Sequence, residues 1–170
     1  MGGLVEDLVL LARLDQERPF ATEKVDLAEV TQEAVADARA AEPDRKVLAE
    51  VGTGTMTVDG DADRFRQVVA NLLGNVRTHT EPETQAIVSV DRDGDWVVLA
   101  VTDHGPGMEP EVAAHAFERF FQGSPDRTTP GSGLGLAIVR SIVERHGGTV
   151  ELNSTPGEGT TVRLRIPASA

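Results

Sequence analysis

The chain has 170 residues, of which 39% are hydrophobic, and this length and composition predict one domain with a well-buried core. Its 28 acidic and 16 basic side chains leave a formal charge of −12 without a basic cluster, so we expect no nucleic-acid partner. The absence of cysteine excludes disulfides and thiolate metal sites. No apolar run approaches the roughly 20 residues that cross a bilayer, so we expect the fragment itself to be soluble.

The first quarter of the chain predicts two helices and a linker between them. Apolar residues at three- and four-residue spacing predict a short helix over 4–14, and the polar stretch 16–21 predicts a linker. A short strand and a second helix follow. This helix is expected to run from the N-cap Asp26 to about Ala41, because Pro43 prevents its continuation.

The rest of the chain predicts strands and further helices. Alternating polarity and turn residues predict strands over 46–51, 55–59, 85–90, 95–103, 149–153 and 160–166. Amphipathic patterns predict helices over 61–78, 110–116 and 134–146. The polar stretch 117–130 predicts a mobile loop. We therefore expect an α/β (α+β) two-layer sandwich, in which about three helices cover one face of a mixed, mostly antiparallel sheet of about five strands.

The first chemical motif, NLLGNVRTHT, runs from Asn71 to Thr80 on the helix predicted over 61–78. Asn71 and Asn75 are four residues apart, so their side chains share one face of this helix. Their amide oxygens are hard ligands, and an uncharged ligand suits magnesium where a nucleotide brings the negative charge. Without the other motifs, the two residues are equally typical of an exposed helix face.

The second motif, DHGPGM, runs from Asp103 to Met108 and follows an apolar strand. The carboxylate of Asp103 is expected at the rim of a hydrophobic slot that suits a purine. An ionised aspartate only accepts hydrogen bonds, and adenine presents an amine where guanine presents a carbonyl oxygen, so ATP is favoured over GTP. Gly105 and Gly107 allow the backbone to turn tightly beside the base. Alone, the motif is an ordinary Asp-x-Gly turn.

The third motif, GSGLGLA, opens the helix predicted over 134–146. Its glycines leave backbone N–H groups free to face phosphates, and the helix dipole favours negative charge there. Gly133 and Gly135 are the expected contact points. A dinucleotide-binding loop would follow a buried strand directly, whereas Gly131 follows a polar loop, so we exclude that reading.

The order and spacing of these motifs resemble the ATP-binding domain of sensor histidine kinases, in the GHKL superfamily with the Bergerat fold, which also holds gyrase, Hsp90 and MutL. The resemblance implies ATP and Mg²⁺ as ligands, with Asn75 as metal ligand and catalytic residue. It implies nucleotide contacts from Asn71, Asn75, Asp103, Gly105, Gly107, Gly131, Gly133, Leu134, Gly135, Leu136 and Thr160. It also implies an ATP lid at about 108–132, within a catalytic domain over 22–170.

The lid region matches the family's phenylalanine box at Phe117, Phe120 and Phe121. The resemblance makes Arg119 and Arg127 candidates for contact with the terminal phosphate, with Arg119 as the expected catalytic arginine.

The chain departs from the family pattern at positions that bear on catalytic strength. Relatives carry lysine and tyrosine where this chain has Thr78 and His79, and many carry arginine at Gln122. Arg77 is one residue early, about 100° round the helix, which makes it a poor replacement for the missing lysine.

The resemblance places the phosphate acceptor, a histidine followed by an acid, on a separate dimerisation hairpin. None of the four histidines here precedes an acid, and residues 1–21 resemble the end of that hairpin's second helix plus a linker. We therefore expect ATP binding with little or no self-phosphorylation. The resemblance further implies a homodimeric inner-membrane protein with this domain in the cytoplasm, acting on a response regulator, while the fragment itself is a candidate monomer.

Two other functions remain open at this point. One is a non-catalytic nucleotide-sensing module, and the other is an anti-sigma-factor serine kinase. A hydrolytic ATPase is disfavoured, because no acid that could serve as a base lies between Asn71 and Thr80.

Overall fold

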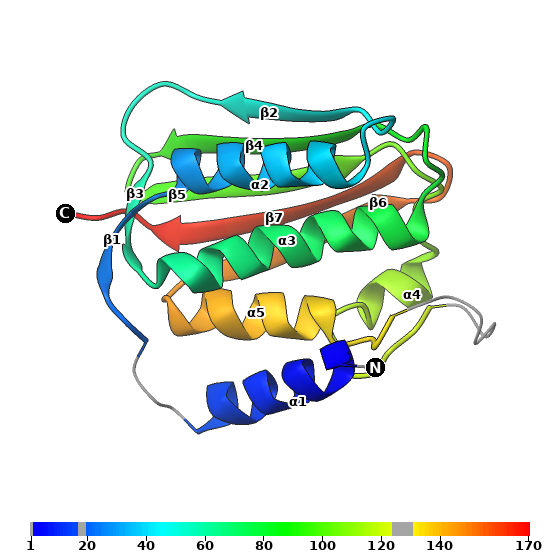
Figure 1. Cartoon of the computed structure of the whole chain (residues 1–170), viewed down its shortest axis with the longest axis horizontal. Coiled ribbons are helices and arrows are strands. Elements are labelled where there is room, and N and C mark those ends of the chain that lie inside the picture. The colour runs from blue at the N-terminus through cyan, green and yellow to red at the C-terminus, as the bar shows by residue number, and fades with distance from the viewer. Residues whose placement is uncertain (1, 17–19, 124–130) are drawn as a thin grey trace.

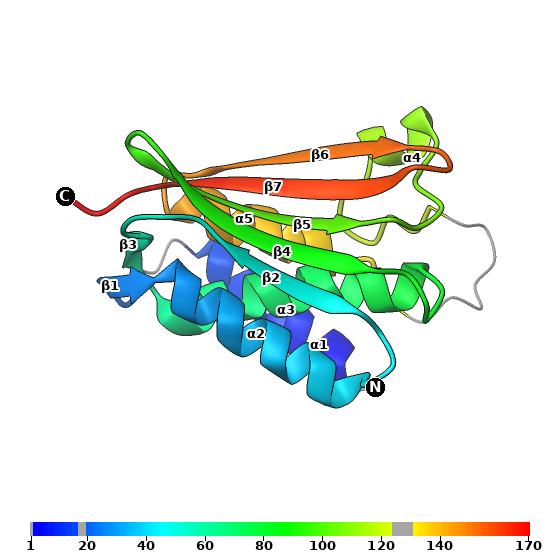
Figure 2. The ribbon, with the colours of Figure 1, turned by 90° about the horizontal axis from the view of Figure 1, so that it is seen from above.

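A computed structural model describes residues 2–16, 20–123 and 131–170. The helices of the described part are α1 (Gly2–Asp15), α2 (Leu27–Ala41), α3 (Ala62–His79), α4 (Pro110–Ala114) and α5 (Gly135–Arg145). The strands are β1 (Glu23–Asp26), β2 (Val47–Val51), β3 (Thr57–Gly60), β4 (Ala86–Asp93), β5 (Trp96–Asp103), β6 (Thr149–Thr155) and β7 (Gly159–Pro167). Helices α2, α3 and α5 lie side by side on one face of the sheet (Figures 1 and 2).

The main sheet has five strands in the order β2-β4-β5-β7-β6. Strand β2 pairs with β4 in parallel, and the other pairs are antiparallel, so the predicted mixed two-layer fold is confirmed. Strands β2 and β3 flank a glycine turn but do not pair with each other. Instead β3 pairs with β1 in a separate two-stranded sheet. The part of the predicted loop at 124–130 lies outside the described residues.

Local sequence explains where α2 and α3 begin. The carboxylate of Asp26 accepts a hydrogen bond from the Ala28 N–H at 2.9 Å, and that of Asp61 accepts from the Arg64 N–H at 3.2 Å. Both aspartates therefore satisfy N–H groups that the helix leaves free. The apolar stripe of α3 faces the sheet as predicted, and its buried members are Phe65, Val68, Val69, Leu72, Leu73 and Val76.

Helix α1 packs against α5, on the side away from α3 (Figure 1). Leu10, Leu11 and Leu14 are buried there, whereas Leu4 and Val5 remain exposed. The end of α1 is also tied down by polar contacts, since the Arg145 guanidinium donates to the Leu14 carbonyl oxygen. Within the described residues, no helix combines the length and apolar character that a membrane span requires.

His146, directly after α5, joins the linker to the core. Its ring stacks on Phe20 at 4.9 Å between centroids and contacts Phe65 at 4.4 Å. Nδ1 donates to the Ile142 carbonyl at 2.7 Å, which leaves Nε2 to accept from the Asp61 N–H at 3.2 Å. This pattern requires the neutral ring. Burial lowers the pKa of His146, in spite of the bond to Ile142.

We expect the free energy of unfolding to fall as the pH drops below about 6.5, the ordinary pKa of histidine. The depressed pKa favours the neutral form in the folded state, so this stabilisation is complete above that pH and is lost on acidification. Protonated Nε2 cannot accept from Asp61, which removes a bond worth about 1 kcal/mol. Urea unfolding between pH 5 and 8 should show a shallower pH dependence for His146→Gln, whereas His104→Gln should behave like the parent. Equal slopes for the parent and His146→Gln would contradict this assignment.

Candidate nucleotide-binding site

A cavity of about 580 Å³ brings the three sequence motifs together. It is lined by α3, the turn after β5, the start of α5 and the hairpin of β6 and β7 (Figure 1). The predicted contact residues that line it are Asn71, Asn75, Asp103, Gly107, Gly131, Gly133, Gly135, Leu136 and Thr160. Gly105, Leu134 and Arg119 do not line it. Stretches far apart in the sequence thus form one hollow.

The face of α3 presents two amides of different standing. Asn71 Nδ2 lies 3.4 Å from the Gly135 carbonyl oxygen, so this amide ties α3 to the start of α5. Asn75 makes no hydrogen bond within the described residues and lines the cavity. Its Oδ1 lies 3.6 Å from the position that a Cβ on Gly135 would take. A free amide oxygen therefore faces the N-terminus of α5, where phosphates are expected, and this fits a magnesium ion bridging to phosphate oxygens.

Asp103 ends β5 opposite Thr160 of β7. Its Oδ1 accepts the Gly105 N–H at 2.9 Å, and its other oxygen has no partner within the described residues. The Thr160 hydroxyl lies 2.8 Å from that of Ser154, which also accepts from the Met108 N–H at 2.8 Å. One carboxylate oxygen is therefore held by the turn while the other remains available to a base.

Apolar side chains complete the wall beside Asp103. Val101, Leu152 and Val162 line the same cavity and come from three neighbouring strands. A flat purine ring placed against them would lose water on its faces while its edge meets the carboxylate.

Two glycines let strands and turns approach closely behind this wall. Gly107 has φ +69°, and a Cβ there would lie 2.1 Å from the Thr155 carbonyl oxygen. Gly159 has φ +110°, and a Cβ there would lie 2.0 Å from the Asp103 carbonyl oxygen. Sequence reasoning gave Gly159 no role, although a glycine that opens a strand after a turn signals such a close approach.

The glycine loop leaves the N-terminus of α5 open. Leu134, at the N-cap position, is fully buried and provides no side-chain cap. Its N–H donates to the Ser132 hydroxyl at 3.3 Å, while Gly135 and Leu136 line the cavity. The first N–H groups of an uncapped helix and its dipole favour an anion at this point. Leu134 thus supports the loop from beneath.

The base of the lid is fixed to the glycine loop by backbone contacts. The Phe120 N–H donates to the Gly133 carbonyl at 3.0 Å, and Gln122 Nε2 donates to the Gly131 carbonyl at 2.7 Å. Phe121 lines the cavity, whereas Phe120 is 58% exposed.

The predicted arginines do not reach the cavity in this structure. Arg119 forms a bidentate ion pair with Asp15 at 2.7 and 3.0 Å. Arg77 pairs with Glu42 at 3.1 Å, on a different side of α3 from the cavity. Arg127 lies outside the described residues. No arginine or lysine of the described part lines the cavity.

Two further polar residues line the cavity that sequence reasoning left without a role. Asp7 of α1 lies 3.2 Å from the Ser132 hydroxyl, which places a carboxylate beside the glycine loop. Nothing near Asp7 in the sequence signals this, because the contact spans 125 positions. His79 also lines the cavity. Removal of water from its imidazole lowers its pKa, and the negative charge of Asp103 opposes this shift.

Comparison with known proteins agrees with this arrangement. Residues 60–170 match the family described as Histidine kinase-, DNA gyrase B-, and HSP90-like ATPase. The chain is 42% identical over 166 residues to the probable sensor histidine kinase TcrY of Mycobacterium tuberculosis, covering 96% of this chain and 35% of TcrY. It is 35% identical over 173 residues to the sensor-like histidine kinase SenX3 of the same organism, covering 99% of this chain and 42% of SenX3. The chain therefore spans well under half of these relatives.

Solved structures give the same assignment. The mycobacterial sensor histidine kinase MprB superposes with a TM-score of 0.76 at 31% identity, covering 85% of this chain and 97% of that one. Full-length ShkA in complex with AMPPNP superposes with a TM-score of 0.85 at 30% identity, covering 99% and 36%. These relatives are histidine kinases, so the serine-kinase alternative is not favoured. The chain belongs to the histidine kinase, DNA gyrase B and HSP90-like ATPase family, as an ATP-binding catalytic domain of the sensor histidine kinase type.

Proposed function

We propose that this chain binds Mg²⁺–ATP in the cavity between α3 and α5 and transfers the γ-phosphate to a histidine on a separate dimerisation hairpin. One observation supports this most directly. A free amide oxygen on Asn75, a free carboxylate oxygen on Asp103 and the uncapped N-terminus of α5 all border one cavity. These groups suit a metal, an adenine amine and phosphates respectively.

In the proposed mechanism, the residues of this chain chiefly bind and orient. Asp103 accepts a hydrogen bond from the adenine amine, while the N–H groups at Gly135 and Leu136 stabilise negative charge on the phosphates. Magnesium, when bound through Asn75, neutralises charge on the phosphate oxygens. The bond between the γ-phosphorus and the bridging oxygen breaks as a bond to the acceptor imidazole nitrogen forms, and ADP leaves.

The lid arginine has a defined place in this proposal. Arg119 is bound to Asp15 in this structure, so its predicted contact with the terminal phosphate requires that ion pair to open. The pair is exposed, and exposed ion pairs contribute roughly 0–1 kcal/mol, so a triphosphate can displace Asp15 at little cost.

Residues 1–21 are proposed as the end of the dimerisation hairpin and its linker, 22–170 as the catalytic domain and 108–132 as the lid. In the whole protein, we propose a homodimer at the bacterial inner membrane with this domain in the cytoplasm, from which phosphate passes to a response regulator. The close packing of α1 on α5 supports a direct mechanical connection between hairpin and catalytic domain.

We expect phosphohistidine only when an acceptor is supplied. Incubation with radiolabelled ATP and magnesium should label a separately added dimerisation hairpin of the sensor histidine kinase type, but not this chain alone. A hairpin whose acceptor histidine is changed to glutamine is the control and should stay unlabelled. Stable label on this chain by itself would contradict the proposal. Nucleotide binding without transfer to any hairpin would favour a non-catalytic sensor, for which the absence of a described lysine or arginine in the cavity is the supporting observation.

A further inference from the structure

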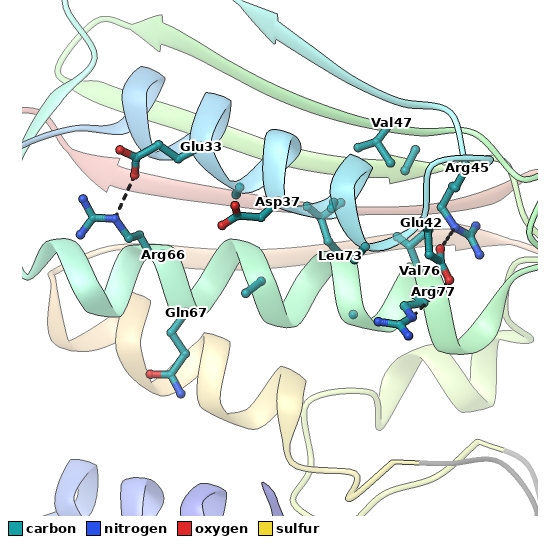
Figure 3. A pocket seen from close by; sticks show the side chains of 16 residues that line it. Glu33, Asp37, Glu42, Arg45, Val47, Arg66, Gln67, Leu73, Val76 and Arg77 are labelled. Carbon is teal, nitrogen blue, oxygen red and sulfur yellow. Dashed lines mark hydrogen bonds and ion pairs between the residues drawn. The ribbon is translucent and has the colours of Figure 1, made fainter.

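A second cavity, of about 430 Å³, lies between α2 and α3 (Figure 3). Its floor is apolar and includes Leu73 and Val47, while charged side chains of the two helices border it. Figure 3 shows Glu42 between two guanidinium groups at one end of this cavity. Glu42 Oε1 lies 3.1 Å from Arg77 Nε, and its Oε2 lies 2.6 Å from Arg45 Nε.

Arg45 is the most enclosed charged residue of the described part, with 6% of its surface exposed. Besides Glu42, its guanidinium donates to the Thr80 hydroxyl at 2.8 Å and to the carbonyl oxygens of Glu81 at 3.0 Å and Thr84 at 3.2 Å. Burying a guanidinium is unfavourable unless its donors are satisfied, and these bonds provide that compensation. The side chain thus fastens the segment that follows α3 to the end of α2.

Thr80 carries this contact to the wall of the nucleotide cavity. Its hydroxyl receives the bond from Arg45 and donates to the Val76 carbonyl at 2.6 Å, so the rotamer is fixed on both sides. The methyl group then points at the turn after β5, where Thr80 Cγ2 would lie 2.6 Å from a Cβ on Gly105. Gly105 in turn donates its N–H to Asp103. Thr80 itself lines the nucleotide cavity.

We propose that Arg45 is a positioning residue for base recognition: by fixing the Thr80 rotamer, it holds the turn at Gly105 so that the Asp103 carboxylate faces adenine. This inference rests on the proposed nucleotide site. Arg45 does not line the nucleotide cavity, so its effect passes through Thr80 and not through contact with the ligand. Base selection, more than phosphate binding, is what it controls.

The test compares binding of ADP and GDP without magnesium, by titration calorimetry, for the parent and Arg45→Met. We expect ADP affinity to fall about tenfold and GDP affinity to change by less than about twofold. Arg39→Met is the matched control. Arg39 also donates to a backbone carbonyl, that of Val47 at 2.7 Å, but does not contact Thr80, so the ADP preference should stay within about twofold of the parent. Urea unfolding of each variant establishes that folded protein is compared.

A double-mutant cycle tests the route through Thr80. Thr80→Ser keeps the hydroxyl but removes the methyl group, and should lower the preference for ADP in the same direction. Adding Arg45→Met to Thr80→Ser should then have less than half of its effect on binding in the parent, since both act on one contact. If Arg45→Met does not fold, Arg45→Lys replaces it, with the same expected direction.

The outcomes separate this inference from the proposed function. A parent that binds ADP while Arg45→Met keeps its preference, or loses ADP and GDP affinity equally, would overturn the positioning role. Full additivity in the cycle would also overturn it. A parent that binds neither nucleotide would instead overturn the proposed function.

Discussion

Asp103→Asn is expected to weaken ATP binding by about 10- to 100-fold and to remove the preference for ATP over GTP. In the parent, Oδ1 is held by the Gly105 N–H, so only the other oxygen can face the base. In the variant, the amide oxygen would keep the Gly105 bond and the NH₂ group would face the base. Two donors then meet at adenine, while guanine presents an acceptor to the new donor. Competitive titration with ATP and GTP measures the change.

The control for this prediction is Asp59→Asn on β3. It makes the same charge change at a residue that pairs with Lys24 at 3.6 Å, outside the nucleotide cavity. It should leave both affinities within about twofold of the parent. If Asp103→Asn keeps the parental preference for ATP, Asp103 does not read the base.

Asn75→Ala is expected to remove the part of nucleotide affinity that depends on magnesium, by about 10- to 100-fold. The Asn75 amide is free within the described residues, so its loss breaks no internal hydrogen bond. Affinity in the presence of a chelator should therefore change by less than about twofold. Titration of ATP with magnesium and with chelator gives both numbers for each variant.

Gln67→Ala on the same helix is the matched control for Asn75→Ala. It also removes an amide, but one that bonds Arg64 at 3.0 Å and lies outside the nucleotide cavity. It should preserve the magnesium dependence. Loss of the magnesium effect in Gln67→Ala, or its retention in Asn75→Ala, would remove the metal role from Asn75.

The helices and hairpins could be predicted because local chemistry determines them. Asp26 and Asp61 cap helices within three residues of themselves, and Asp93-Gly94 closes a two-residue hairpin between β4 and β5. The strand order could not be predicted in this way. That β2 runs parallel to β4 depends on how α2 packs, and no residue near the turn at 52–54 encodes it.

The site divides along the same line. Asn75, Asp103 and the glycine loop carry their chemistry in short segments, and the structure brings these segments to one cavity. The Arg119–Asp15 ion pair joins residues 104 positions apart, and the Arg45–Thr80 bond joins residues 35 apart. Such contacts exist only in the folded chain, which is why neither the placement of the lid arginine nor the role of Arg45 could be read from the sequence.

The central claim is that three separated segments bind one adenine nucleotide. Amide NMR spectra of the parent, recorded during titration with ADP and magnesium, test it most directly. We predict that the largest shift changes fall in 71–80, 103–108 and 131–137, with a common dissociation constant. Shift changes confined to the cavity between α2 and α3, or different constants for the three segments, would contradict it.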